Sequence, residues 1–185
     1  MEDINFSNNS KEKILGKIEK AKIYAFSVDL YKSLQDKIFQ YSKKIDEEQL
    51  GEKMTNYYKS EIKKFEKIIE NSSAHFDTLF DFKIALESLN IKKENVNDIL
   101  AHENAHANKL EQLGGKHGGY EIIFLKTEKG FSIIPRNCSF YPKEWSEEKY
   151  IDVVKQVVKA PDEYGNSMSP DDIDKLNYLE GLKKK

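Results

Sequence analysis

Apolar residues recur at steps of three and four through the first half of the chain, which is the spacing of an amphipathic helix. One apolar stripe runs over 11–45 and a second over 54–69, with the polar segment DEEQLG between them. The pattern predicts one long helix and a second helix that folds back on it as an antiparallel hairpin. The polar residues NSS at 71–73 then provide a cap candidate for a third helix over about 74–89.

The second half of the chain changes from helical to β-type patterning and back. Helical spacing over 96–113 ends at a glycine pair, which is a typical helix terminator. The next segment, GYEIIFLKTEKGFSIIP at 119–135, has two β-rich runs separated by a polar turn and predicts a β-hairpin. Helical spacing returns over 146–159, and Ser169 followed by Pro170 predicts the cap and the first residue of a short last helix.

These elements predict a mainly α protein with a small β-hairpin, of the α+β class. With 185 residues the chain is long enough for one domain, or for a core domain with a helical appendage. The expected division is a disordered N-terminus at 1–10, a helical hairpin plus a third helix at 11–90, and a second half at 91–185 that carries the candidate chemistry.

Charge and composition exclude several classes of function. Lysine and arginine number 30 against 32 aspartates and glutamates, so the basic excess of a nucleic-acid-binding surface is missing. No apolar run approaches the roughly 18 residues of a membrane span, and the polar start MEDINFSNNSKEK is unlike a secretory signal. A single cysteine, Cys138, excludes an intrachain disulfide and fits a reducing compartment. We therefore expect a cytoplasmic protein with neither a nucleic-acid nor a membrane partner.

Residues 102–106 read His-Glu-Asn-Ala-His, which is the HExxH pattern. On a helix, residues four apart lie on one face about 6 Å apart at Cβ, so His102 and His106 can reach one zinc ion. Glu103, beside the first histidine, can then take a proton from water activated by the metal and pass it to a leaving amine. Helical phase places both histidines within the apolar stripe and Glu103 at its margin.

The segment ILAHENAHA resembles the active-site helix of HExxH zinc metallopeptidases, the zincins, with uncharged residues at both middle positions and after the second histidine. HENAHA followed about 25 residues later by SIIPRN is faintly similar to the start of the peptidase domain of membrane-anchored ATP-dependent zinc proteases. The resemblance implies a minimal zincin-like domain with Zn²⁺, His102 and His106 as ligands, Glu103 as catalytic base and a peptide or protein as substrate. No copy of the downstream acidic ligand segment of those proteases is recognisable.

A catalytic zinc usually has three protein ligands and one open position, and the sequence leaves the third ligand open. Glu147 is one candidate, because helical phase puts it at the apolar face of its helix. Glu148 forms an ExxxD spacing with Asp152, but this pair points outward by the same phase. His117, in the glycine-rich GGKHGG, requires a loop that turns back to the metal, and Cys138 is a fourth candidate.

Three kinds of protein are compatible with these residues: a zinc-dependent peptidase, a zinc hydrolase of non-peptide substrates, and a non-catalytic interaction module with a structural HExxH helix. In the module, helices over 11–70 would join copies of the chain into a homo-oligomer. A di-iron bundle would need a second ExxH pair, and no other histidine has a glutamate three residues before it. In a peptidase, a strand edge at 120–126 or 130–134 is expected to pair with an extended substrate.

Overall fold

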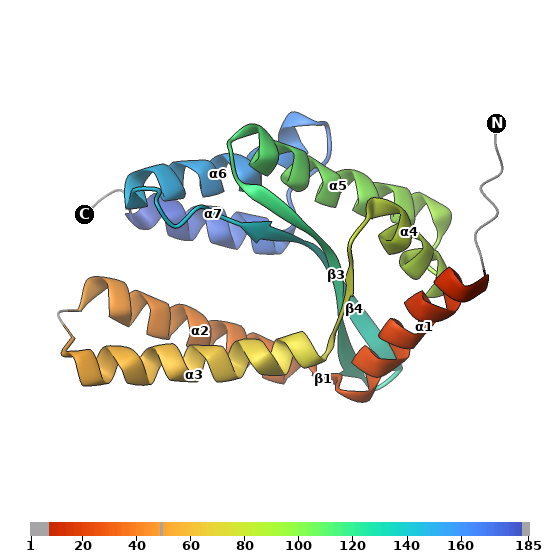
Figure 1. Cartoon of the computed structure of the whole chain (residues 1–185), viewed down its shortest axis with the longest axis horizontal. Coiled ribbons are helices and arrows are strands. Elements are labelled where there is room, and N and C mark those ends of the chain that lie inside the picture. The colour runs from red at the N-terminus through yellow and green to blue at the C-terminus, as the bar shows by residue number, and fades with distance from the viewer. Residues whose placement is uncertain (1–7, 49, 183–185) are drawn as a thin grey trace. The chain divides into compact units, whose positions relative to one another are not determined.

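The computed structural model describes residues 8–48 and 50–182. These residues form, in order (Figure 1), α1 (Asn8–Ile23), β1 (Phe26–Ser27), α2 (Val28–Glu47), α3 (Glu52–Asn71), β2 (Ser73–Phe76), α4 (Leu79–Ser88), α5 (Lys93–Gln112), β3 (Lys116–Thr127), β4 (Gly130–Phe140), α6 (Glu147–Glu163) and α7 (Pro170–Leu182). The predominance of helix beside a small sheet confirms the predicted α+β class. None of the helices in this part of the chain is both long and apolar enough to cross a bilayer.

The chain divides into two compact units that are interleaved along the sequence. Of the described residues, the first contains 8–14, 75–121 and 135–182, and the second contains 15–48, 50–74 and 122–134. Strands β3 and β4 contribute residues to both units, whereas α4, α5, α6 and α7 belong to the first and α2 and α3 to the second.

The single long helix predicted over 11–45 is wrong, because the chain forms α1 and α2 with a short strand between them. Ser27 caps α2, and its side-chain oxygen accepts a hydrogen bond from the Leu30 N–H at 3.2 Å. Apolar residues continue in helical phase across this break, so periodicity alone does not reveal it. Of the N-terminus predicted to be disordered, residues 8–10 form the first turn of α1, and 1–7 lie outside the described residues.

Helices α2 and α3 form the predicted antiparallel hairpin and lie side by side in Figure 1. At its base, Tyr31 and Leu34 of α2 and Ile69 of α3 are buried together with Ile123 and Leu125 of β3. Burial of an apolar side chain of this size stabilises a fold by roughly 1.5–3 kcal/mol, so this cluster anchors the hairpin. β1 adds a parallel pairing, with Phe26 opposite Leu125.

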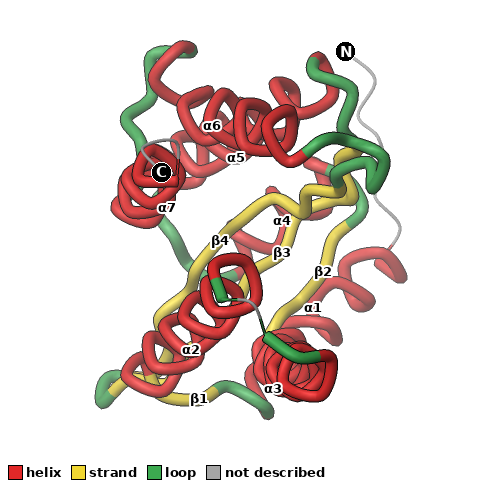
Figure 2. Tube along the Cα trace, turned by 90° about the vertical axis from the view of Figure 1, so that its left-hand side faces the viewer, coloured by secondary structure: helices red, strands yellow, loops and turns green. Residues whose placement is uncertain are grey.

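The predicted β-hairpin is confirmed, and β3 and β4 run side by side in Figure 2. Gly130 at the start of β4 has a φ of +125°, which an L side chain rarely adopts and glycine does. β3 also pairs with β1 and β2.

The third helix begins later than predicted, because residues 73–76 form β2. The Phe124 N–H donates to the Ser72 carbonyl at 2.9 Å, which ties this segment to β3. The helix, α4, starts at Leu79 and is capped by Thr78, whose hydroxyl oxygen accepts from the Asp81 N–H at 3.1 Å. The NSS cap candidate was therefore wrong.

Three helices of the first unit pack in sequence and position the candidate site. Leu110 of α5 is fully buried against Val153 and Val157 of α6. Other apolar residues of α6, including Val154 and Val158, are buried against Leu176 and Leu179 of α7. The predicted helix over 146–159 is α6 with one further turn, and the predicted start of the last helix at Pro170 is confirmed.

Candidate metal centre

The HExxH residues lie in the middle of α5, as the apolar periodicity predicted. The helix ends at Gln112, and Gly114 follows with a φ of +87°, a conformation that suits the glycine of a helix C-terminus. Val96, Ala107 and Leu110 are buried along one side of the helix, and Glu103 and His106 lie among them. Ordinary amphipathic packing therefore holds the polar residues of the motif inside the first unit.

His102, His106 and Asp172 bring their side-chain donor atoms together. The two Nε2 atoms of the histidines are 3.1 Å apart. His102 Nε2 is 3.1 Å from Oδ2 of Asp172, and His106 Nε2 is 3.5 Å from Oδ1 of the same carboxylate. All three side chains are largely buried, with exposed fractions of 16%, 7% and 15%. They are the only described His, Cys, Asp or Glu residues that form such a group of three, with ligand atoms within 4.8 Å of one another.

The orientation of the His106 ring is fixed by α6. Its Nδ1 lies 2.7 Å from the carbonyl oxygen of Val157, which can only accept a hydrogen bond. Nδ1 therefore carries the proton, and in the neutral ring Nε2 presents a lone pair toward His102 and Asp172. A metal-bound histidine commonly has such a carbonyl partner behind it.

The three donor groups could hold a metal ion. Nitrogen lone pairs 3.1 Å apart, next to a carboxylate, repel one another unless a proton or a cation lies between them. Ligand atoms bound to tetrahedral zinc at about 2.0–2.1 Å are about 3.3 Å apart, close to the 3.1–3.5 Å separations of this cluster. The hydrogen bond to Asp172 raises the pKa of His102, which favours a proton on this ring in the metal-free protein.

Asp172 reaches the cluster from the first turn of α7. The Ser169 N–H and hydroxyl donate to its Oδ2 at 3.0 and 2.7 Å, and the Asp172 N–H donates back to the Ser169 oxygen at 3.2 Å. This is a reciprocal helix cap. Burial opposes ionisation of Asp172, but the neighbouring His102 and His106 and the hydrogen bonds from Ser169 hold its pKa below the usual range. The carboxylate is therefore charged and oriented by its own helix terminus.

Glu103 is more deeply buried than the helical phase predicted, with 6% of its surface exposed. The backbone N–H of Asn137 in β4 donates to its Oε2 at 2.8 Å. Burial raises the pKa of Glu103 to about 7, although the neighbouring histidines act in the opposite direction. A carboxyl group with this pKa exchanges protons readily near neutral pH.

Each polar residue of the motif is attached to a different element of the first unit. His102 contacts Asp172 of α7, Glu103 the β4 backbone, and His106 the carbonyl of an α6 residue. Asn104, a middle residue of the motif, accepts a hydrogen bond from the Tyr120 hydroxyl of β3 at 3.2 Å. A site whose side chains are held from four directions is organised before a ligand binds.

Neither of the two ligands proposed from the sequence as the third, Glu147 and His117, belongs to the cluster. Glu147 is the first residue of α6, directly after the cap Ser146, and it is exposed. The buried residues of α6 begin at Ile151. Helical phase therefore placed Glu147 on the apolar face correctly, but that face is not covered in the first turn. Asp172 was not named from the sequence. The Ser169 cap was recognised, but no local signal links it to histidines so distant along the chain.

His117 and Cys138 lie elsewhere in the first unit. The His117 ring packs edge-on against Tyr120, and its Nε2 is buried without a hydrogen-bond partner among the described residues. Burial lowers the pKa of His117 and raises that of Cys138 to about 12, so the thiol stays protonated. Cys138 Sγ lies 3.6 Å from Nδ1 of His75.

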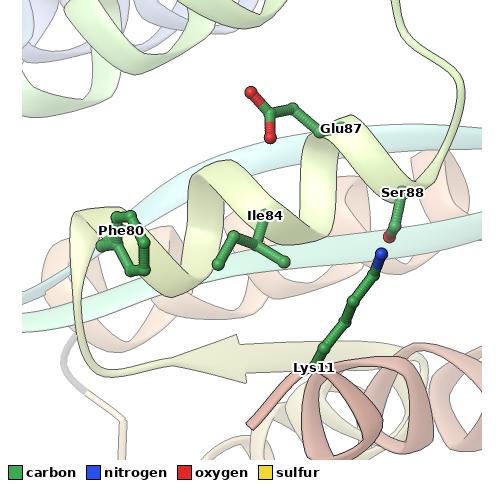
Figure 3. Close-up of a pocket in the computed structure, with 5 residues that line it drawn as sticks. All are labelled: Lys11, Phe80, Ile84, Glu87 and Ser88. Carbon is green, nitrogen blue, oxygen red and sulfur yellow. The ribbon is translucent and has the colours of Figure 1, made fainter. Parts of the chain in front are cut away.

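A surface hollow of about 280 Å³ lies between the start of α1 and α4 (Figure 3). Phe80 and Ile84 form its apolar part, and Lys11, Glu87 and Ser88 complete the lining. None of the metal-centre residues lines it.

Comparisons of this chain with known protein families, curated proteins and solved structures give no match.

Proposed function

We propose that this protein is a zinc-dependent metallopeptidase, with His102, His106 and Asp172 as zinc ligands and Glu103 as general base. The observation that carries the proposal is the convergence of two imidazole nitrogens and a carboxylate oxygen next to a buried glutamate of the same helix. Two nitrogen ligands and one oxygen ligand leave a fourth position open, which is typical of catalytic zinc, whereas structural zinc sites are closed and often rich in cysteine.

Zinc held by these residues would supply a Lewis acid that lowers the pKa of water and polarises a substrate carbonyl. The other functions belong to the chain itself. Glu103 accepts the proton that water releases as it attacks the carbonyl carbon, and it donates this proton to the amine that leaves. Val157 and Ser169 keep His106 and Asp172 in the orientation that binding requires.

A peptide substrate is supported by the position of β4. The extended backbone of this strand contacts Glu103 through Asn137. Extended peptides bind to strand edges through backbone hydrogen bonds, and a strand next to the base would align the scissile bond with it.

The test compares zinc content and proteolysis for four purified proteins. Wild type, Glu103→Gln, His106→Ala and the control Glu111→Gln, an exposed glutamate of the same helix, are analysed by mass spectrometry of metals and incubated with fluorescently labelled casein. We expect wild type and Glu111→Gln to bind zinc and cleave casein. Glu103→Gln should retain zinc and lose at least about 100-fold in rate, because a general base typically contributes 10²–10⁴-fold. His106→Ala should lose zinc.

Other outcomes separate the alternatives. Wild-type protein that is isolated without zinc and does not take it up would contradict the metal centre itself. Protein that binds zinc but cleaves only ester or formyl substrates would be a hydrolase of another class. Protein that binds zinc and cleaves none of these substrates would favour a non-catalytic interaction module.

A further inference from the structure

We infer that the backbone N–H of Asn137 in β4 is a positioning group that holds the Glu103 carboxylate ready for proton transfer. The inference rests on the proposed function. Among the described residues, the hydrogen bond from Asn137 to Oε2, 2.8 Å long, is the only one that this carboxylate forms. Glu103 is only 6% exposed, so its carboxylate needs a donor in place of water, and β4 provides it.

The two carboxylate oxygens of Glu103 have different surroundings. Oε2 accepts the Asn137 hydrogen bond, and Oε1 has no hydrogen bond within the described residues. A glutamate side chain has three rotatable bonds, and a hydrogen bond to one oxygen restricts the arrangements they can adopt. Oε2 therefore anchors the group, and Oε1 is the oxygen available to receive and return a proton. Such orientation matters because a misplacement of about 1 Å can lower a rate about 100-fold.

The donor is a backbone group, so most substitutions at this position preserve it. The Asn137 side chain is engaged elsewhere, and its Nδ2 donates to the Ser139 hydroxyl at 3.2 Å. Proline alone among the amino acids lacks the N–H, and it is tolerated in strands where that N–H is not needed for the ladder. Asn137→Pro and Asn137→Ala thus form a matched pair. Both remove the side chain, and only the first removes the hydrogen bond.

The first measurement is steady-state cleavage of a fluorogenic peptide derived from a casein cleavage site, with zinc content and thermal unfolding determined for each variant. In Asn137→Pro we expect kcat to fall about 10- to 100-fold, with KM and zinc content close to those of wild type. Asn137→Ala should retain the wild-type kcat. A strand that merely supported the fold would instead lower zinc content and the unfolding temperature together with the rate.

The second measurement needs no activity and decides the case if Asn137→Pro does not fold. Hydrogen exchange of the Asn137 amide is expected to be faster in Glu103→Ala than in wild type and unchanged in Glu111→Ala. Equal exchange in all three proteins, or an Asn137→Pro variant with wild-type kcat, overturns this inference and leaves the proposed function intact. Wild-type protein that binds zinc and cleaves no peptide overturns the proposed function, and this inference with it.

Discussion

Helix α5 of the first unit and the α2–α3 hairpin of the second are both amphipathic, yet their side chains have different surroundings. In α5 the polar residues of 102–106 are bound to partners on four other elements. In the hairpin, the two helices contact mainly each other beyond the base, and rings such as Tyr41 and Tyr58 are only partly buried. Met54 and Tyr57 are 44% and 50% exposed.

This difference indicates where substitutions matter. Interactions that join elements distant along the chain transmit a local change to several helices and strands, whereas exposed contacts within a helical pair have small effects. We therefore expect α5 to be sensitive and the outer face of the hairpin to be tolerant. Two of the following experiments examine the interactions of the α5 centre, and one compares α5 directly with the hairpin.

The largest effect is expected at Asp172. Replacement of Asp172 by Ala should weaken zinc binding by at least about 100-fold, because loss of a partner that only orients a ligand already lowers metal affinity 10- to 100-fold. Glu147→Gln, at the ligand position favoured by helical phase, should bind zinc as wild type does. Titration with a competing zinc chelator measures both affinities. Loss of zinc in Glu147→Gln together with full binding in Asp172→Ala would show that the sequence-based assignment was correct.

The next effect concerns stability. Leu110→Ala should lower the free energy of unfolding by about 2–5 kcal/mol, since Leu110 is fully buried between α5 and α6 and its truncation leaves a cavity. Tyr57→Ala, on the exposed side of α3, should change it by less than about 0.5 kcal/mol. Urea unfolding followed by circular dichroism measures both. Comparable losses in the two variants would mean that the hairpin is covered, for instance by a second copy of the chain.

The smallest effect is a dependence on pH. The hydrogen bond to Asp172 raises the pKa of His102, and the proton must leave before metal binds. Below this pKa, zinc affinity should fall by up to about tenfold per pH unit for each proton displaced.

The raised pKa of His102 also makes the stability of the metal-free protein depend on pH, but in the opposite direction to zinc affinity. A group whose pKa is raised by folding stabilises the fold at low pH, and this contribution disappears as pH rises through the folded-state pKa. The Tm of chelator-treated protein should therefore decrease with rising pH, while the increase in Tm on adding zinc should grow. A zinc effect that is constant from pH 5.5 to 8.5 would argue against protonation at His102.

Local signals predicted most of the elements and the centre of the candidate site. Apolar spacing predicted α5, and the HExxH pattern indicated His102 and His106 because both lie within one helical turn. The same reasoning missed the break between α1 and α2, where spacing continues in phase through Ser27. A helix cap is a single residue, and the apolar spacing of the residues around it stays the same. Spacing alone therefore cannot show where one helix ends and the next begins.

The rest of the site depends on tertiary packing. Asp172 reaches the histidines only because α7 is buried against α6 and α6 against α5. A carboxylate in the first turn of a helix is common for electrostatic reasons, so its presence in the sequence does not distinguish Glu147 from Asp172. The Asn137 contact with Glu103 is made by a backbone N–H, which every residue except proline has, so the sequence at this position does not reveal it.

Asp172 takes part at once in the terminus of a helix and in the donor cluster. By thermodynamic reciprocity, whatever orders the start of α7 strengthens cation binding, and a bound cation orders α7 to the same degree. A change at Leu176 or Leu179, which pack against α6, would then alter the metal affinity of the proposed centre. If the proposed centre binds a metal, its occupancy would in this way depend on events at α7 as well as on metal concentration.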